Sequence, residues 1–264
     1  MVRMRTGFFG FVKDIDAIAR AGYDCIEMHV KEIMSLDDSS CVDTKKKIRD
    51  SGLTAEVFDN PLPLDKIIAD PIFDMAFYTD YVKKAMGRIA ELGARYVVYG
   101  NGKTRSASGS LELAKNDEML ARVCKAAEEH NITILLEPLA SQICNRFLSV
   151  PEIFEYVNTM GFRNMKTLVD YRWFLAGGHS FRMLYDFADF IQHVHIDNPD
   201  LVFPTRKVPN SNDGHDYSAL FSALKKICYK GIIAIEANTF DDFEGDMKKG
   251  LELFATHGII PYKA

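Results

Sequence analysis

The chain has 264 residues, about the size of one (β/α)₈ barrel and short for two separate cores, so we expect one domain over residues 1–264. Hydrophobic residues make up 47% of the chain and charged residues 26%, a balance that argues against intrinsic disorder. The net charge of −5 argues against nucleic acid as a partner, because binding a phosphate backbone requires concentrated Lys and Arg.

Short apolar runs alternate along the chain with longer segments of helical periodicity. We predict strands for the short runs, at 7–9, 25–28, 53–58, 96–99, 132–136, 166–169, 191–196 and 232–235. Apolar residues at helical spacing between these runs predict helices that end near Gly22, Gly93, His130, Gly161 and Gly231. Ser149 and Glu152, with Pro151 between them, form a capping box at the start of one of these helices. The alternation predicts an α/β protein folded as a single (β/α)₈ TIM barrel.

Two loops indicate what kind of functional site the chain carries. The stretch 198–213 is the longest without a predicted element, and irregular loops of this length are usually functional. Gly100 and Gly102 are not followed by the third glycine of a dinucleotide-binding loop. The sequence therefore favours a closed barrel over an open sheet that binds a dinucleotide.

In a (β/α)₈ barrel the functional residues lie where the strands end and the following loops begin. The residues at the predicted ends are mostly acidic: Glu27, Glu56, Glu137, Asp170, His195 and Glu236, with Tyr99 at the fourth strand. Carboxylates directly after apolar strands are costly unless they are paired, protonated or bound to a cation. Glu137, Asp170, His195 and Glu236 end consecutive strands, and three carboxylates with one imidazole suit Mn²⁺, Mg²⁺ or Co²⁺. The alternative is that each is an ion-paired or hydrogen-bonded residue of the barrel rim.

Six segments of the chain resemble the sugar phosphate isomerase/epimerase superfamily of xylose-isomerase-like TIM barrels. They are GYDCIEMHV at 22–30, LGARYVVYGNGKTR at 92–105, ILLEPL and NRF within 134–147, TLVDYRWF at 167–174, IQHVHIDNP at 191–199 and GIIAIEAN at 231–238. The superfamily includes ketose 3-epimerases, hydroxypyruvate and inosose isomerases, inosose dehydratases and repair enzymes of the endonuclease-IV type.

The resemblance implies that Glu137, Asp170, His195 and Glu236 bind one divalent metal, with Mn²⁺ as the first expectation and Co²⁺, Mg²⁺ or Zn²⁺ as alternatives. It also implies that Glu137 and Glu236 are the catalytic residues, acting as acid and base on the substrate. The expected reaction is the isomerisation or epimerisation of a small sugar or sugar derivative through a cis-enediolate. A role in carbohydrate metabolism and a homo-oligomeric state are further expectations that come with the family.

Two departures from the ketose 3-epimerases leave other reactions open. Their E-x-x-N-R-F-E pattern becomes a longer loop between Glu137 and Asn145, and Leu148 replaces the final glutamate. Trp173 stands where those enzymes have a histidine after the aspartate ligand. The first alternative is therefore a lyase, like the inosose dehydratases or C-glycoside-cleaving enzymes, which expels a group from the same enolate. A repair enzyme of the endonuclease-IV type is less favoured, because it needs a His-rich zinc site, and a binding subunit without catalysis is a fourth reading.

Five further residues are predicted to bind the substrate: Glu56, Arg172, Trp173, His193 and Arg206. For Trp173 and His193 the alternative is a packed or buried role without substrate contact. His29, next to the strand end at Glu27, is another candidate for substrate contact. Basic residues also follow the strands, at Lys103, Arg105, Arg146, Arg172, Arg206 and Lys207. They favour an anionic substrate such as a phosphorylated or carboxylated sugar, and ion pairing with the rim carboxylates is an equally weighted alternative.

The expected compartment follows from the cysteines and from the apolar runs. The five cysteines form no CxxC pair, which is typical of a reducing compartment. No apolar run approaches the ~20 residues of a membrane span, and the run at 7–12 is too short for a signal peptide. We therefore expect a cytoplasmic protein that does not bind membranes.

Overall fold

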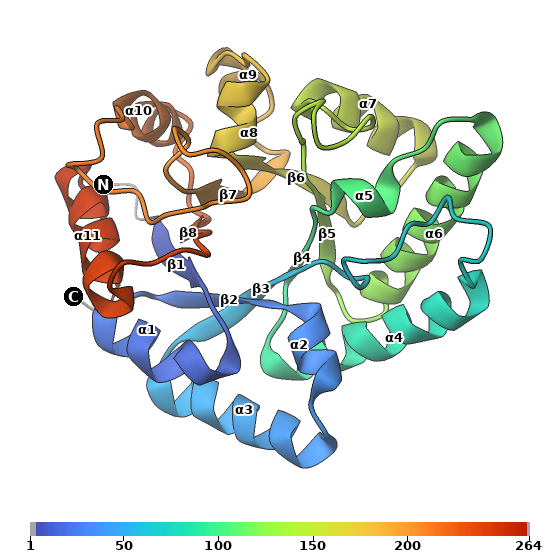
Figure 1. The fold of residues 1–264 in the computed structure, drawn as a ribbon, viewed down its shortest axis with the longest axis horizontal. Coiled ribbons are helices and arrows are strands. Elements are labelled where there is room, and N and C mark those ends of the chain that lie inside the picture. Colours follow the sequence, from blue (N-terminus) through green and yellow to red (C-terminus); the bar gives the residue numbers. More distant parts are fainter. Residues whose placement is uncertain (1–3, 263–264) are drawn as a thin grey trace.

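A computed structural model describes residues 4–262 and contains eight parallel strands closed into a barrel in the order β1 to β8 (Figure 1). The strands are β1 Arg5–Phe9, β2 Cys25–His29, β3 Thr54–Asp59, β4 Tyr96–Tyr99, β5 Thr133–Leu136, β6 Met165–Asp170, β7 Ile191–Ile196 and β8 Ile232–Ile235. β1 pairs with both β2 and β8, so the sheet has no free edge. The predicted (β/α)₈ barrel is confirmed, and three predicted strands, at 96–99, 191–196 and 232–235, have the observed bounds.

The longer helices surround the barrel, and shorter ones lie within the connections (Figure 1). The helices are α1 Ile15–Ala21, α2 Val30–Ser35, α3 Asp38–Ser51, α4 Met75–Leu92, α5 Gly102–Arg105, α6 Ser110–Glu128, α7 Val150–Met160, α8 Tyr171–Ala176, α9 Arg182–Asp186, α10 Ser218–Lys226 and α11 Phe243–Thr256. A short 3₁₀ helix, η1, covers Val12–Asp14. Among the residues described, no helix combines the length and the apolarity that crossing a membrane would need.

Two of the long helices, α3 and α11, are not predicted from the sequence. In α3 only Thr44 and Ile48 are buried, so the helix lacks a broad apolar stripe. The apolar pattern of α11 is interrupted by Gly245 and Gly250. A Cβ on Gly250 would lie 2.5 Å from the side chain of Ile235, so this glycine allows α11 to pack closely on β8.

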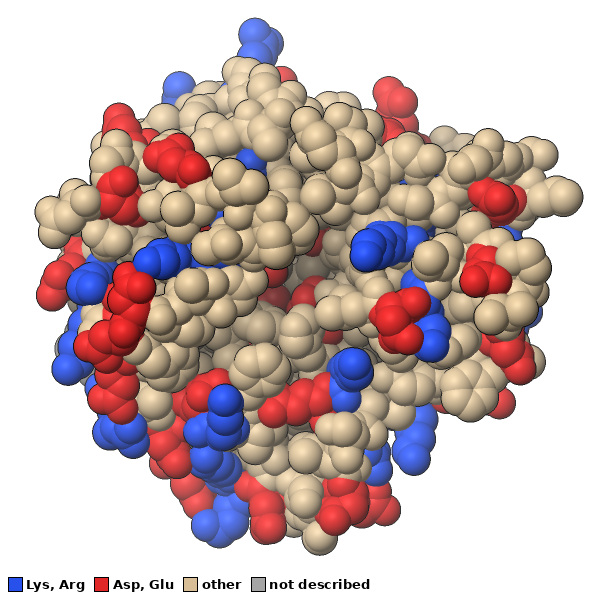
Figure 2. Space-filling view, in the orientation of Figure 1, with Lys and Arg blue, Asp and Glu red and all other residues tan. Residues whose placement is uncertain are grey.

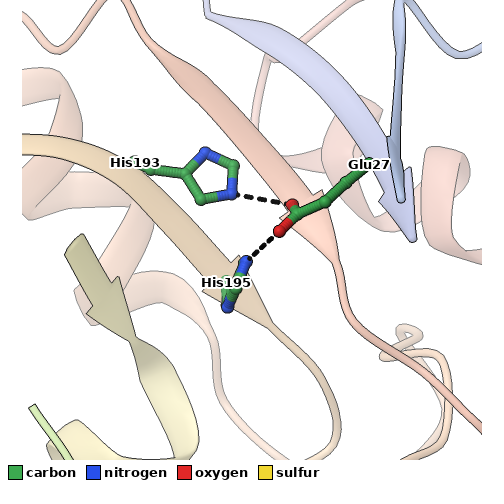
Figure 3. A group of neighbouring side chains, drawn as sticks. All are labelled: Glu27, His193 and His195. Carbon is green, nitrogen blue, oxygen red and sulfur yellow. Dashed lines mark hydrogen bonds and ion pairs between the residues drawn. The ribbon is translucent and has the colours of Figure 1, made fainter. Parts of the chain in front are cut away.

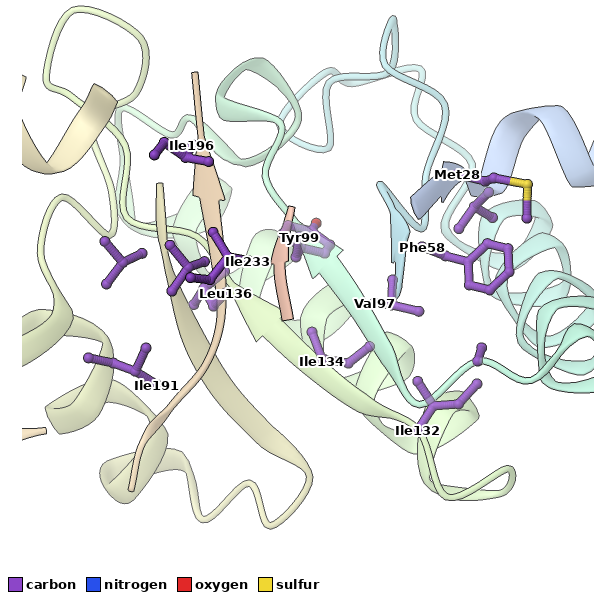
Figure 4. Packing of buried hydrophobic residues seen from close by; sticks show 14 of the residues in the cluster. Met28, Phe58, Val97, Tyr99, Ile132, Ile134, Leu136, Ile191, Ile196 and Ile233 are labelled. Carbon is purple, nitrogen blue, oxygen red and sulfur yellow. The ribbon is translucent and has the colours of Figure 1, made fainter. Parts of the chain in front are cut away.

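The strand side chains divide between two apolar cores. Those that point outward pack against the helices, as Ile134, Leu136 and Ile233 do in Figure 4. A smaller set fills the inside of the barrel: Cys25, Val57, Val98, Leu135, Leu168, Ile232 and Ala234. Because both faces of each strand are buried, several strands are almost continuously apolar, and this pattern makes them recognisable in the sequence.

The start of α7 fixes the loop between β5 and that helix. The Ser149 hydroxyl accepts a hydrogen bond from the Glu152 backbone N–H at 3.4 Å, as the capping pattern predicts. The Glu152 carboxylate reaches further back than a standard capping box, and accepts hydrogen bonds from the backbone N–H groups of Phe147 and Leu148 at 2.8 and 2.7 Å. The loop that begins at Glu137 is thereby tied to the first turn of α7.

Candidate active site

Four side chains from the carboxyl ends of consecutive strands converge inside the barrel. One ligand atom each of Glu137, Asp170, His195 and Glu236 lies within 4.8 Å of the corresponding atoms of the other three. The pleat explains the convergence, because residues two apart on a strand point to the same side. Three of the four follow a residue of the inner core by two positions, namely Leu135, Leu168 and Ala234. The four residues predicted from the strand ends are therefore the ones that the barrel brings together.

The group has the chemistry of a divalent metal site. The His195 Nδ1 atom lies 3.3 Å from Glu236 Oε2 and 3.8 Å from Glu137 Oε1. His195 Nδ1 is buried and makes no hydrogen bond. Buried polar atoms are normally satisfied, so an imidazole nitrogen that lacks a hydrogen bond among three carboxylates fits a bound cation.

The two glutamates of this group differ in their protonation. Burial raises the pKa of Glu137 to about 8, and the neighbouring charges of Asp170 and Glu236 add to the effect. Burial also acts on Glu236, but the positive charges of Arg206 and His195 outweigh it and lower the pKa to about 2. One carboxyl is therefore held neutral and the other ionised when no cation is bound.

A cavity of about 540 Å³ opens above two of the four residues. Glu137 and Glu236 line it, whereas Asp170 and His195 do not. Figure 2 shows a hollow at the centre of this face with acidic atoms on its floor. Polar side chains on the wall include His29, Asp59, Asn101, Gln142 and Asn238. The size is that of a small-molecule site.

Trp173 and Arg206, both predicted to bind substrate, line this cavity. The Trp173 ring lies 5.2 Å from the ring of Phe203, which belongs to the long loop 198–213. Arg206 donates a hydrogen bond to Asp170 Oδ2 at 2.8 Å, and its other terminal nitrogen lies 3.1 Å from Glu236 Oε2. The cavity therefore has an aromatic wall next to a fixed positive charge.

Gly100 has a role in the site that the sequence does not reveal. A Cβ at this position would lie 2.1 Å from Glu137 Oε2, closer than any contact between non-bonded atoms. The residue follows β4, whose last residue Tyr99 pairs with Leu136 on β5, so it lies beside the start of the Glu137 loop. The glycine thus provides the space that the Glu137 carboxylate occupies.

Glu56, also predicted to bind substrate, does not line this cavity. Glu56 lies in the first half of β3, where its carboxylate pairs with Arg5 at the amino end of β1 and with Arg95 just before β4. The register of β2 with β3 shifts nearby, so that Val57 pairs with Glu27. The acidic residue that reaches the cavity from β3 is Asp59.

Arg172 and His193 also do not contact the cavity, contrary to the prediction. Arg172 is buried and donates hydrogen bonds to Asp197 at 2.5 and 2.8 Å and to the backbone carbonyls of Asn198, Leu201 and Thr205. It therefore holds the loop 198–213 in place. His193 is fully buried, and its Nε2 atom lies 3.0 Å from Glu27. This position agrees with the alternative prediction that His193 is buried and does not contact the substrate.

Most basic residues of this face are occupied by partners. Arg105 is buried and donates hydrogen bonds to the backbone carbonyls of Tyr99 and Glu137, at 2.8 and 2.5 Å. Arg146 pairs with Asp117 at 2.6 Å and Lys207 with Asp241 at 2.7 Å. Lys103 also lines the cavity, and it forms no ion pair with the described residues. The ion-pairing alternative thus holds for most of these side chains.

The chain is similar to one protein family and to many solved structures. The model of the xylose isomerase-like TIM barrel family matches residues 15–257, and no curated protein matches the chain. D-allulose 3-epimerase from Methylomonas sp. in complex with D-allulose is 19% identical with a TM-score of 0.79, over 97% of this chain and 98% of that one. 3-keto-D-glucoside 4-epimerase from E. coli is 17% identical with a TM-score of 0.78, over 97% and 99%. An AP endonuclease of family 2 from Brucella melitensis is 19% identical with a TM-score of 0.76, over 100% of both chains. At these identities the likeness to solved structures is one of fold.

Proposed function

The chain belongs to the xylose isomerase-like TIM barrel family, and we propose that it is a divalent-metal-dependent isomerase or epimerase of a small sugar or sugar derivative. The observation that carries this proposal is that, of the four clustered residues, Glu137 and Glu236 line the cavity. A molecule in the cavity meets two carboxyl groups directly, while Asp170 and His195 lie beneath them. This is the arrangement that proton removal and return on one substrate require.

Glu137, Asp170, His195 and Glu236 would hold the cation, with Mn²⁺ as the expected ion. When bound, the cation would polarise a carbonyl and its neighbouring hydroxyl, which acidifies the hydrogen on the carbon between them. Glu236 is the proposed base, because its side chain is 24% exposed, against 7% for Glu137, and Arg206 keeps it ionised. Glu236 takes the proton and leaves a cis-enediolate. Glu137 then gives a proton to the same carbon for epimerisation, or to the adjacent carbon for isomerisation.

The walls of the cavity suit a carbohydrate. Trp173 and Phe203 offer aromatic faces for the C–H groups of a sugar, and Asn101, Gln142 and Asn238 offer hydrogen-bonding groups for hydroxyls. Lys103 is the group best placed to bind an anionic substituent, if the substrate carries one. Addition of inorganic phosphate or a sugar acid at millimolar concentration should then inhibit the wild-type protein and affect Lys103→Met much less.

The proposal is tested by hydrogen exchange on a panel of ketoses, sugar acids and inososes, followed by NMR in D₂O with Mn²⁺ present. We expect deuterium at the carbon next to the carbonyl of the true substrate. Chelation with EDTA should abolish the exchange and Mn²⁺ should restore it. Exchange that survives complete removal of the metal would refute the proposal.

The role of Glu236 is tested by Glu236→Gln. We expect deuterium exchange to fall by about a hundredfold or more, the usual contribution of a positioned base, while the protein keeps its fold. Glu252→Gln, on the exposed face of α11, is the matched control and should exchange at the wild-type rate. Wild-type exchange by Glu236→Gln would assign the base to another residue.

A lyase is the second candidate, and one feature of the cavity favours it. His29 and Asp59 line the same cavity, with His29 Nδ1 at 3.3 Å from Asp59 Oδ2. A third acid–base group beside the glutamates could protonate a group that leaves the enediolate. An isomerase conserves the mass of its substrate and a dehydratase loses water, so mass spectrometry separates them. If the lyase assignment holds, His29→Asn should stop elimination and leave deuterium exchange in place.

A further inference from the structure

Glu27 forms a hydrogen-bonded group with two histidines beneath the candidate metal site. Its carboxylate accepts hydrogen bonds from His195 Nε2 at 2.9 Å and from His193 Nε2 at 3.0 Å (Figure 3). All three side chains are almost completely buried. Glu27 comes from β2 and both histidines come from β7, so the group joins strands that are not neighbours in the barrel.

The contact with Glu27 decides which nitrogen of His195 is free. A carboxylate accepts hydrogen bonds and cannot donate one, so the nitrogen that faces it carries the hydrogen. In a neutral imidazole the other nitrogen, Nδ1, then has the lone pair. Nδ1 is the atom of His195 that faces Glu137 and Glu236 and that has no hydrogen bond.

On the basis of the metal site proposed above, we infer that Glu27 is a positioning residue that fixes the tautomer and the orientation of His195, and that His193 holds Glu27 in place. Each carboxylate oxygen of Glu27 is engaged by one imidazole, so a rotation of the carboxylate would break at least one of the two hydrogen bonds. The two rings stand at 88° to each other with their centroids 4.7 Å apart. His193 therefore acts on the site through Glu27 and does not contact the substrate.

The same three residues could also hold a metal ion of their own. Two observations favour the positioning role. The distances from the two imidazole nitrogens to the Glu27 oxygens are typical of hydrogen bonds. Each oxygen of the Glu27 carboxylate thus already has a hydrogen-bond donor. The group also lies below the residues that line the cavity, so it has no open position for a substrate.

The inference is tested by Mn²⁺ calorimetry on Glu27→Gln, with Glu56→Gln as the matched control. Glu56 is the corresponding third residue of the next strand, and it pairs with arginines away from the histidines. We expect Mn²⁺ affinity to fall about 10–100-fold in Glu27→Gln, with one ion bound per chain in the wild type, and to stay unchanged in Glu56→Gln. Wild-type affinity in Glu27→Gln would overturn the inference. So would a second Mn²⁺ ion in the wild type that Glu27→Gln loses.

A second variant and a second readout cover the case in which Glu27→Gln does not fold. His193→Phe keeps an aromatic ring and removes the donor, so we expect a loss of Mn²⁺ affinity of a few fold. Burial acts to lower the pKa of His195, but the carboxylates of Glu27 and Glu236 outweigh it and raise this pKa, so the spectra are recorded at a pH high enough to leave the ring neutral. Under that condition the ¹⁵N shifts of the His195 ring report the tautomer without any metal. They should show a hydrogen on Nε2 in the wild type and a shift towards Nδ1 in Glu27→Gln; an unchanged tautomer would overturn the inference. Because this readout needs neither metal nor turnover, failure of the proposed function can be told apart from failure of the inference.

Discussion

Gly100 shows how a residue without a side chain can leave room for a residue of the site. The backbone of Gly100 lies next to the Glu137 carboxylate, and a Cβ at this position would lie 2.1 Å from Glu137 Oε2. Gly100→Ala should therefore displace Glu137 and weaken Mn²⁺ binding by about tenfold or more, an effect comparable to losing a supporting partner of a metal ligand. Calorimetry measures the affinity, and Gly109→Ala is the control, since a Cβ there meets no atom within 4 Å. Equal affinity in the two variants would contradict this role.

Residues at the strand ends could be predicted only in part. Glu137, Asp170, His195 and Glu236 follow or end apolar strands, so the strand-end rule is enough to group them. Glu56 fails the same rule, because a register shift between β2 and β3 is invisible in the sequence. Burial and hydrogen-bond partners, which place Arg172 and His193 away from the cavity, depend on the fold in three dimensions.

At the scale of elements, apolar patterning decides what can be predicted. The strands are buried on both faces and stand out as apolar runs, whereas α3 buries little and α11 contains two glycines that break its pattern. The glycines of helices are not equivalent, however. Gly250 is required for the close packing of α11, but Gly87 within α4 has room for a side chain, since a Cβ there would meet His130 at an ordinary 3.7 Å.

Gly87→Ala should therefore stabilise the protein. Alanine in the interior of a helix is favoured over glycine by about 1 kcal/mol, because glycine loses more backbone entropy on folding. Urea unfolding measures the change, and we expect a higher free energy of unfolding with unaltered deuterium exchange on the substrate. A lower free energy of unfolding would mean that α4 needs the glycine for a contact with its neighbours.

At the scale of the whole molecule, one end of the barrel carries the candidate site and the other end carries ion pairs that join strands. The carboxyl ends of the strands carry the candidate site, and near the amino ends Glu56 joins β3 to β1 and to the start of β4 through Arg5 and Arg95. Burial acts to raise the pKa of Glu56, but the hydrogen bond from Arg5 and the charges of both arginines outweigh it, so the pKa lies below its usual value. The ion pairs therefore stabilise the fold and have no expected part in the reaction.

Glu56→Gln should lower the free energy of unfolding at pH 7 by about 1 kcal/mol, since the pairs are partly exposed. A carboxyl whose pKa is lower in the folded state stabilises the protein above its unfolded value, about 4.3, and the contribution is lost as the pH falls through the folded value. The difference between wild type and variant should thus shrink as the pH is lowered below about 4. Urea unfolding at pH 7 and pH 3.5 measures it, and a difference that grows in acid would contradict the assignment.

In the proposed function, the ends of β5 to β8 hold one divalent cation beneath a sugar-sized cavity. The most direct measurement is anomalous diffraction from a crystal of the protein soaked in Mn²⁺. We expect one strong peak per chain, among Glu137, Asp170, His195 Nδ1 and Glu236. A crystal that shows no peak there, or that shows it between Glu27 and His193, would contradict the claim.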